Sequence, residues 1–221
     1  MYATVPSDAA FDLVVVAASQ GGLAVYRRIL AALPPEFPAA VVVVQHRVAS
    51  APDVLARLLS RDTRLAVQPA QAGERPRSGT VQVAPANRQL LLTAAGTFAL
   101  VELEDGVALA DPLLISAAAA FGPRTLAVIL SGRLHDGAAG AQAVKQAGGR
   151  VLVQDQASAE WFGMPSAAIA TGCVDFVLPA DTIASALIAL TMAPGAAAWL
   201  RVPLPAWAPL RQRRPGRPLV S

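Results

Sequence analysis

The stretch DLVVVAASQGGLAVYRRIL (residues 12–30) decides the fold class. It begins with a short run of β-branched apolar residues, 12–17, which is typical of a strand buried in a parallel sheet. Apolar residues then recur at helical spacing over 21–33, and Pro34-Pro35 end that pattern. Ser19 stands between the two elements, where it could cap the helix, belong to a phosphate-binding loop or act as a nucleophile.

The same alternation of strand and helix patterns continues along the chain. Between residues 64 and 102 it is interrupted by four short strand candidates, the last two joined by a hairpin turn at Gly96. These patterns predict an α/β fold, doubly wound, with a mainly parallel sheet, helices on both faces and an antiparallel β-hairpin insertion. The other predicted elements are strands at 40–45, 125–130, 150–154 and 174–178, and helices at 51–61 (capped by Ser50), 111–121, 138–147, 165–171 and 181–192.

Composition indicates one compact domain followed by a tail. The 221 residues are 54% hydrophobic and 15% charged, which is enough for one sizeable core. Five arginines and no acidic residue lie in 194–221, so the net charge of +3 for the whole chain leaves −2 for residues 1–193. We therefore expect one compact domain over 1–193, a Pro/Arg-rich flexible tail over 194–221 and no nucleic-acid partner.

Targeting signals are missing from the sequence pattern. The N-terminal residues MYATVPSDAAFD lack the basic start and apolar middle of a signal peptide. The longest uncharged stretch, 182–200, is rich in alanine and is broken by Pro194-Gly195, so we expect no membrane insertion. Cys173 is the only cysteine, which excludes an intramolecular disulfide. These features together predict a cytoplasmic protein.

Three polar residues follow three separate predicted strands. Ser19 and His46 follow the first two, and Asp136 lies in the loop SGRLHDGAAG after a later one. In open α/β sheets, ligands bind beyond the carboxyl ends of the strands. Ser, His and Asp are the residue types of a nucleophile, its general base and the group that orients the base. The three positions together favour a hydrolase.

Each of these residues also has an ordinary structural role. Ser19 could be a helix N-cap, and Gly21-Gly22 could form a phosphate loop. However, the chain lacks the G-x-G-x-x-G fingerprint at this place and no lysine follows the glycines. The same glycines would let backbone N–H groups approach an oxyanion.

The histidine and aspartate have structural alternatives too. His46 could be a loop or core histidine, and Asp136 before Gly137 could be a turn or cap residue. The pair His135-Asp136 invites a metal interpretation, but the chain holds two histidines and no cysteine cluster. We expect neither a metal site nor a cofactor.

Longer segments resemble the catalytic domain of CheB-type chemotaxis methylesterases, the protein-glutamate methylesterases. The resemblance covers roughly 11–192, and its most specific part is QDQASAEWFGMPSAAI (154–169). It implies a serine hydrolase that removes methyl esters from glutamate side chains of chemoreceptors, and some members of the family also deamidate receptor glutamines. The implied partner is a methyl-accepting chemoreceptor or a similar methylated protein.

The family's functional residues fall on the three residues at the strand ends. The nucleophile corresponds to Ser19, the base to His46 and the acid to Asp136. We expect the backbone around Gln20, Gly21 and Gly22 to form part of the oxyanion site.

The sequence departs from the family pattern around the expected cleft. The usual Met-Gly pair ahead of the acid is Arg133-Leu134, the Met-Pro after the histidine is Arg47-Val48, and the Arg-Pro-Ser-Val-Asp stretch is DPLLI (111–115). We expect Arg133 to contact substrate. The altered loop also leaves an alternative open, namely a catalytically degenerate module that binds receptors or signalling partners.

The usual N-terminal receiver domain has no counterpart in this sequence. Constitutive activity, control by a separate response regulator, and a sequence that is one part of a longer chain stay open.

Overall fold

The computed structural model describes residues 10–47, 53–103, 106 and 108–193. The expected cap Ser50 and the predicted tail 194–221 lie outside the described residues, as does Val48. None of the helices in the described ranges has the length and apolarity needed to cross a bilayer.

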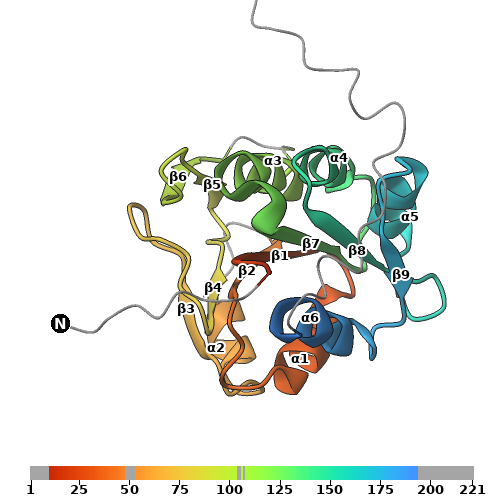
Figure 1. Ribbon diagram of the computed structural model, residues 1–221, viewed down its shortest axis with the longest axis horizontal. Helices are drawn as coiled ribbons and strands as arrows, with labels where there is room; N and C mark the ends of the chain where they lie inside the picture. Colours follow the sequence, from red (N-terminus) through yellow and green to blue (C-terminus); the bar gives the residue numbers. More distant parts are fainter. Residues whose placement is uncertain (1–9, 48–52, 104–105, 107, 194–221) are drawn as a thin grey trace, which may run out of the picture.

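A parallel sheet forms the centre of the molecule (Figure 1). Within the described residues it has seven strands in the order β3-β4-β2-β1-β7-β8-β9, and every neighbouring pair is parallel. Its strands are β1 (Leu13–Ala18), β2 (Ala40–Gln45), β3 (Ala66–Pro69), β4 (Thr80–Val83), β7 (Thr125–Ile129), β8 (Arg150–Gln154) and β9 (Phe176–Leu178).

The strand order reverses between β1 and β7. From β1 the chain builds the sheet toward β3 at one edge, and it then returns to β7 and builds toward β9 at the other edge. Connections leave β1 and β7 on opposite faces, so a crevice opens beyond their carboxyl ends. The fold therefore brings together the loops that follow β1, β2 and β7.

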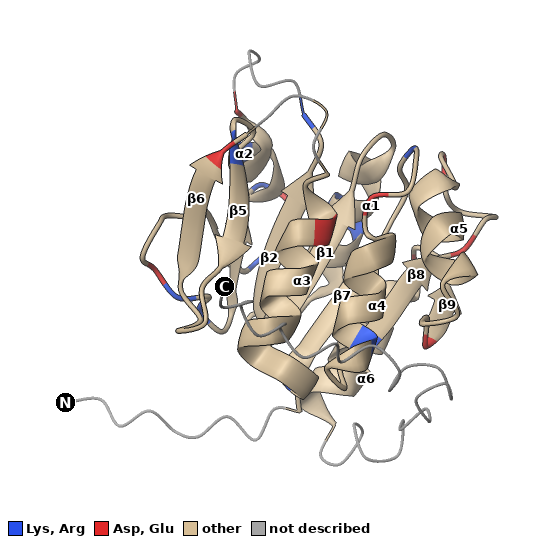
Figure 2. Cartoon of the chain, turned by 90° about the horizontal axis from the view of Figure 1, so that it is seen from above, with Lys and Arg blue, Asp and Glu red and all other residues tan. Residues whose placement is uncertain are grey.

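Helices cover both faces of the sheet, in agreement with the predicted doubly wound architecture. One face carries α1, α2 and α6, and the other carries α3, α4 and α5 (Figures 1 and 2). The helices are α1 (Gly22–Ala32), α2 (Leu55–Leu59), α3 (Ala110–Phe121), α4 (Ala138–Gln146), α5 (Gly163–Ala170) and α6 (Ile183–Met192), and a 3-10 turn, Gly122–Arg124, follows α3.

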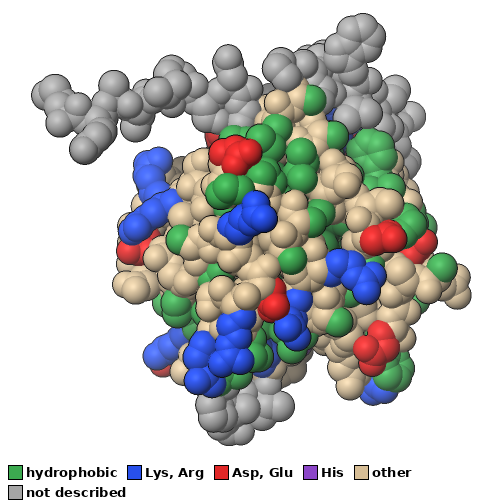
Figure 3. All heavy atoms as spheres, turned by 90° about the horizontal axis from the view of Figure 1, so that it is seen from below, with side chains coloured by type: hydrophobic (Ala, Val, Ile, Leu, Met, Phe, Trp, Pro, Cys, Tyr) green, Lys and Arg blue, Asp and Glu red, His purple; other side chains and the backbone are tan. Residues whose placement is uncertain are grey.

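The apolar run of β1 is uninterrupted because both of its faces are buried. Val14 and Val16 pack with the α1 side, whereas Leu13 and Val15 pack with the α3 side. The covering helices bury one stripe and expose the opposite one. On the face that carries α1 and α6, charged side chains of both signs are accordingly spread over the surface (Figure 3).

The four strands between residues 64 and 102 form two separate pairs. The predicted hairpin is confirmed: β5 (Arg88–Leu92) and β6 (Phe98–Glu102) are antiparallel, and Gly96 adopts the left-handed conformation with φ 73°. β3 and β4 instead extend the parallel sheet, because a connection over 70–79 returns the chain to the start of the next strand.

The helix predicted over 51–61 is shorter in the structure. α2 begins at Leu55, and residues 53 and 54 are not helical. The Asp53 carboxylate accepts hydrogen bonds from Arg47 Nη2 at 3.1 Å and from the Ala86 N–H at 3.0 Å. These contacts tie residue 53 to the β2 and β4 loops, so it does not continue the helix.

Candidate active site

Ser19 lies directly beyond the carboxyl end of β1, in a turn held from two sides. Its N–H donates to the Ser131 carbonyl at 3.0 Å, and Gln45 Nε2 donates to the Ser19 carbonyl at 3.1 Å. The buried Ser131 hydroxyl donates to the Gln20 carbonyl at 2.8 Å. The turn is thus bound to the ends of both neighbouring strands, β2 and β7, and its backbone is fixed.

The two glycines after this turn are required by close packing. Gly21 has φ 76°, and an ideal Cβ on it would lie 2.6 Å from Ser131 Oγ. A Cβ on Gly22 would lie 2.4 Å from the Ala18 Cβ. Both distances are shorter than van der Waals contact, so side chains are excluded here and neighbouring groups pack directly against the backbone at the start of α1.

The turn before α1 presents backbone hydrogen-bond donors. Within the described part of the chain, the N–H groups of Gln20 and Gly21 donate to no protein acceptor, whereas the Gly22 N–H donates to the Ser19 carbonyl. They lie at the N-terminus of α1, where the helix dipole favours negative charge. This turn can therefore receive an anion or a developing oxyanion.

His46 follows β2 and faces Asp136 across the crevice. Its Nε2 lies 3.0 Å from Asp136 Oδ2. The imidazole is 41% exposed, whereas the aspartate side chain is 9% exposed, so the ring shields the carboxylate from solvent. A proton on Nε2 shared with the carboxylate leaves Nδ1 as the ring nitrogen with a free lone pair.

Asp136 is held by backbone amides as well as by His46. Its Oδ2 accepts from the N–H groups of Leu109 and Ala110, and its Oδ1 accepts from the Asp111 N–H, each at 2.9 Å. Burial acts to raise the pKa of Asp136, but the hydrogen bonds from His46 and from the three amides outweigh it and the pKa lies below its usual value. The carboxylate is therefore a fixed anion at neutral pH.

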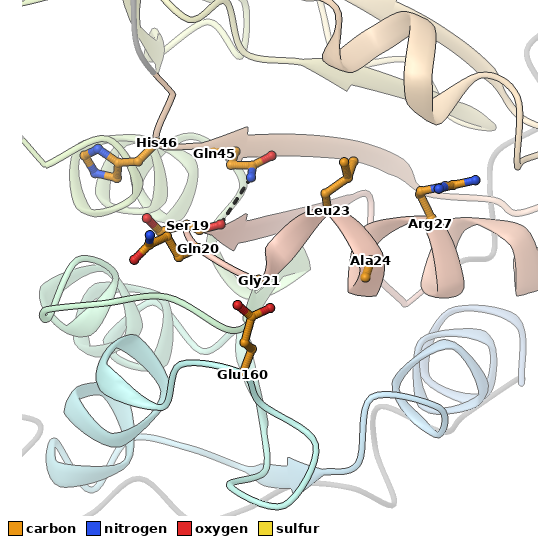
Figure 4. Close-up of a pocket in the computed structure, with 9 residues that line it drawn as sticks. All are labelled: Ser19, Gln20, Gly21, Leu23, Ala24, Arg27, Gln45, His46 and Glu160. Carbon is orange, nitrogen blue, oxygen red and sulfur yellow. Dashed lines mark hydrogen bonds between the residues drawn. The ribbon is translucent and has the colours of Figure 1, made fainter.

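Ser19 and His46 open into one pocket of about 390 Å³ (Figure 4). Gln20 and Gly21 line it next to Ser19, and Asp136 lies behind His46, outside the lining. Among the described residues, no hydrogen bond joins Ser19 Oγ to His46. The structure thus brings the serine and the histidine to one cavity and joins the histidine to the aspartate.

Arg133 and Gly22, the two other predicted site residues, lie outside the pocket lining. The Arg133 guanidinium stacks on the Trp161 ring, 3.9 Å from its centroid, so it does not fill the cavity. Leu134 beside it is 78% exposed and has φ 63°. Neither bulky side chain of the altered loop therefore lines the pocket.

Two charged residues of the pocket lining were not singled out in the sequence. Glu160 points toward Gly21 from the loop after β8 (Figure 4). Trp161 Nε1 donates to Glu160 Oε1 at 3.2 Å. The rule that sites lie beyond the carboxyl ends of strands would have pointed to this loop, because β8 is the neighbour of β7. Arg27 also lines the pocket, and its Nε lies 2.6 Å from Asp62 Oδ2 in an ion pair. This ion pair joins two segments that no local sequence pattern connects.

Among the described residues, no cluster of three or more His, Cys, Asp or Glu side chains is placed to hold a metal ion.

An open parallel sheet with Ser, His and Asp at its carboxyl edge and unpaired amides beside the serine has the residue set of a serine hydrolase. Residues 14–187 match the CheB methylesterase family, and the chain belongs to that family.

Named relatives and a solved structure agree with this assignment. The chain is 41% identical over 191 residues to a "protein-glutamate methylesterase/protein-glutamine glutaminase" of Moorella thermoacetica, which covers 83% of this chain and 45% of the relative. It is 38% identical over 184 residues to the "protein-glutamate methylesterase FrzG" of Myxococcus xanthus, covering 80% of this chain and 54% of the relative. The chain thus spans about half the length of the curated relatives it matches.

The crystal structure of the Thermotoga maritima CheB methylesterase catalytic domain superimposes with a TM-score of 0.77 at 38% identity. The match covers 80% of this chain and 97% of the solved domain. The predicted fold class and the resemblance drawn from the sequence are both confirmed.

Proposed function

We propose that this chain is a serine hydrolase that removes methyl esters from glutamate side chains of chemoreceptor-like proteins. The observation that carries the proposal is the convergence of Ser19 and the His46–Asp136 pair on one pocket beside two unpaired amides. Family membership supplies the substrate class, because the relatives are named as protein-glutamate methylesterases.

In the proposed mechanism, His46 Nδ1 accepts the Ser19 proton while Ser19 Oγ attacks the ester carbonyl. Asp136 holds the ring by Nε2 and stabilises the imidazolium that forms. The imidazolium then protonates the departing methoxide, methanol leaves, and water hydrolyses the acyl-enzyme with His46 again as base.

The oxyanion of each tetrahedral intermediate is assigned to the N–H groups of Gln20 and Gly21. They are fixed before substrate arrives, because the turn is bound to Ser131 and Gln45. Fixed donors need no reorganisation when charge develops, and one such donor contributes about 10²-fold to 10³-fold in kcat. Gly22 acts indirectly, since its missing side chain lets α1 begin this close to Ala18.

The same site would serve glutamine deamidation, with ammonia as the leaving group in place of methanol. The relatives named as glutaminases support this second activity. The non-catalytic alternative rested on the altered loop, and the stacking of Arg133 on Trp161 outside the pocket lining weighs against it.

The proposal also covers the catalytic domain's boundaries, the cellular location and the control of the enzyme. We assign catalysis to 1–193 and expect removal of 194–221 to leave the rate unchanged. The protein acts in the cytoplasm, where receptor methylation sites are, and a separate response regulator is the proposed means of control.

A serine-directed fluorophosphonate probe tests the nucleophile. The wild type should be labelled, Ser19→Ala should not, and Ser60→Ala is the matched control because Ser60 is exposed at the end of α2. Methanol release from a methylated receptor fragment, followed beside ammonia release from its glutamine form, then identifies the substrate. An unlabelled wild type, or labelling that survives Ser19→Ala, would contradict the assignment.

A further inference from the structure

Two aspartates form reciprocal hydrogen bonds between the N-termini of α3 and α4. Asp136, which precedes α4, accepts from Leu109, Ala110 and Asp111 at the start of α3. Asp111 returns the interaction: its Oδ1 accepts from the N–H of Gly137 at 2.9 Å and of Gly140 at 2.7 Å, at the start of α4. Each aspartate thus accepts hydrogen bonds from the N-terminus of the helix next to the other aspartate.

The two helices are close enough for this exchange because of a glycine. α3 and α4 lie side by side (Figure 2), and an ideal Cβ on Gly140 would lie 2.5 Å from the Leu114 Cβ. Leu114 is three residues after Asp111, so the contact at Gly140 places the Asp111 carboxylate against the first turn of α4.

We propose that Asp111 is a positioning residue that holds the Asp136 loop in register with His46, an inference that rests on the proposed function. Asp111 touches no reacting atom in this scheme. It binds the N–H of Gly137, the residue directly after Asp136, and so sets where Asp136 Oδ2 meets His46 Nε2.

Contacts from outside the loop support it, because its backbone is strained at Leu134 and conformationally free at Gly137. Leu134 has φ 63° and Gly137 has φ 104°, so two of the four residues over 134–137 are left-handed. Left-handed conformations persist where surrounding contacts over-determine them. The hydrogen bonds that Asp111 accepts from Gly137 and Gly140 are such contacts.

The acceptor geometry of Asp111, and not its charge, carries the role. Burial raises the pKa of Asp111, and the nearby charge of Asp136 acts in the same direction. The hydrogen bonds from Gly140 and Gly137 oppose them. An asparagine keeps a carbonyl oxygen at the Oδ1 position and removes the repulsion between the two carboxylates. It should therefore replace Asp111 in this function.

Kinetics of ester hydrolysis provide the first test. Asp111→Ala should lower kcat about 10²-fold with KM nearly unchanged, since a displacement on the order of 1 Å in catalytic geometry has that effect. Asp111→Asn should restore most of the rate. Asp12→Ala is the matched control, because Asp12 pairs with Arg124 at the opposite end of the sheet: it should lower the melting temperature and leave kcat alone.

A spectroscopic readout separates this inference from the proposed function. The chain holds two histidines, so ¹⁵N-histidine labelling gives two imidazoles, and His135→Gln assigns the one from His46. The downfield Nε2 proton shared with Asp136 should be present in the wild type and Asp111→Asn and lost in Asp111→Ala. If the wild type does not hydrolyse the ester, the proposed function fails while this comparison still tests Asp111.

The outcomes are distinct. The inference would be overturned if Asp111→Ala kept the downfield proton signal and the kcat of the wild type. It would also be overturned if Asp111→Asn lost as much of the rate as Asp111→Ala. Should Asp111→Ala fail to fold, Asp111→Ser replaces it, since a serine hydroxyl is too short to span the two helices and should behave as the alanine is expected to.

Discussion

Leu134 adopts a backbone conformation that L-residues avoid, so Leu134→Gly should stabilise the protein. Its φ is 63°, and a side chain in the left-handed region costs roughly 1–2 kcal/mol. The side chain is 78% exposed, so its removal sacrifices little burial. Glycine is also more flexible in the unfolded chain, which offsets part of the gain and leaves about 1 kcal/mol. For a domain of this size that corresponds to a rise of about 2–4 °C in melting temperature.

Thermal unfolding followed by circular dichroism, together with urea midpoints, measures this gain. Leu134→Ala is the control, because it removes the exposed apolar surface and keeps the Cβ that causes the strain. It should melt with the wild type. If the alanine variant gained as much as the glycine variant, or if glycine lowered the melting temperature, the strain argument would be refuted.

Three further predictions concern charged groups. The pKa of Asp136 is lower in the folded than in the unfolded protein, so its ionised form adds stability above the unfolded pKa of about 3.9, and this stability is lost as the pH falls through the folded pKa. The difference in urea midpoint between the wild type and Asp136→Asn should therefore disappear below about pH 4. A difference independent of pH would contradict this. Lys145→Met leaves the buried Asp175 carboxylate with fewer partners and should cost about 3 kcal/mol of unfolding free energy by urea titration, and an unchanged urea midpoint would contradict this. Glu160→Gln removes a negative charge from the wall facing the oxyanion turn and should raise kcat/KM about fivefold, whereas an unchanged or lower value would contradict this electrostatic argument.

Local sequence determined the central elements of this protein. The run 12–17 is apolar at every position but the first, and such a run can only be satisfied by burial on both faces, as β1 is. The helical spacing after Gly21-Gly22 likewise predicts α1 with little dependence on its surroundings. Because strands in a parallel sheet end at a common edge, the positions of Ser19 and His46 followed from these elements.

Tertiary structure alone decided how the site is completed. No local pattern distinguishes β3 and β4, which join the parallel sheet, from β5 and β6, which pair as a hairpin, because strand direction depends on the path of the connections. The partners of Asp136 lie 25 to 27 residues away in sequence for the α3 amides and 90 for His46. Glu160 reaches the pocket and Asp111 caps α4 only once helices and strands have packed. Hydrogen bonds between distant segments form where packing places donor and acceptor within about 3 Å, and that distance is a property of the whole fold.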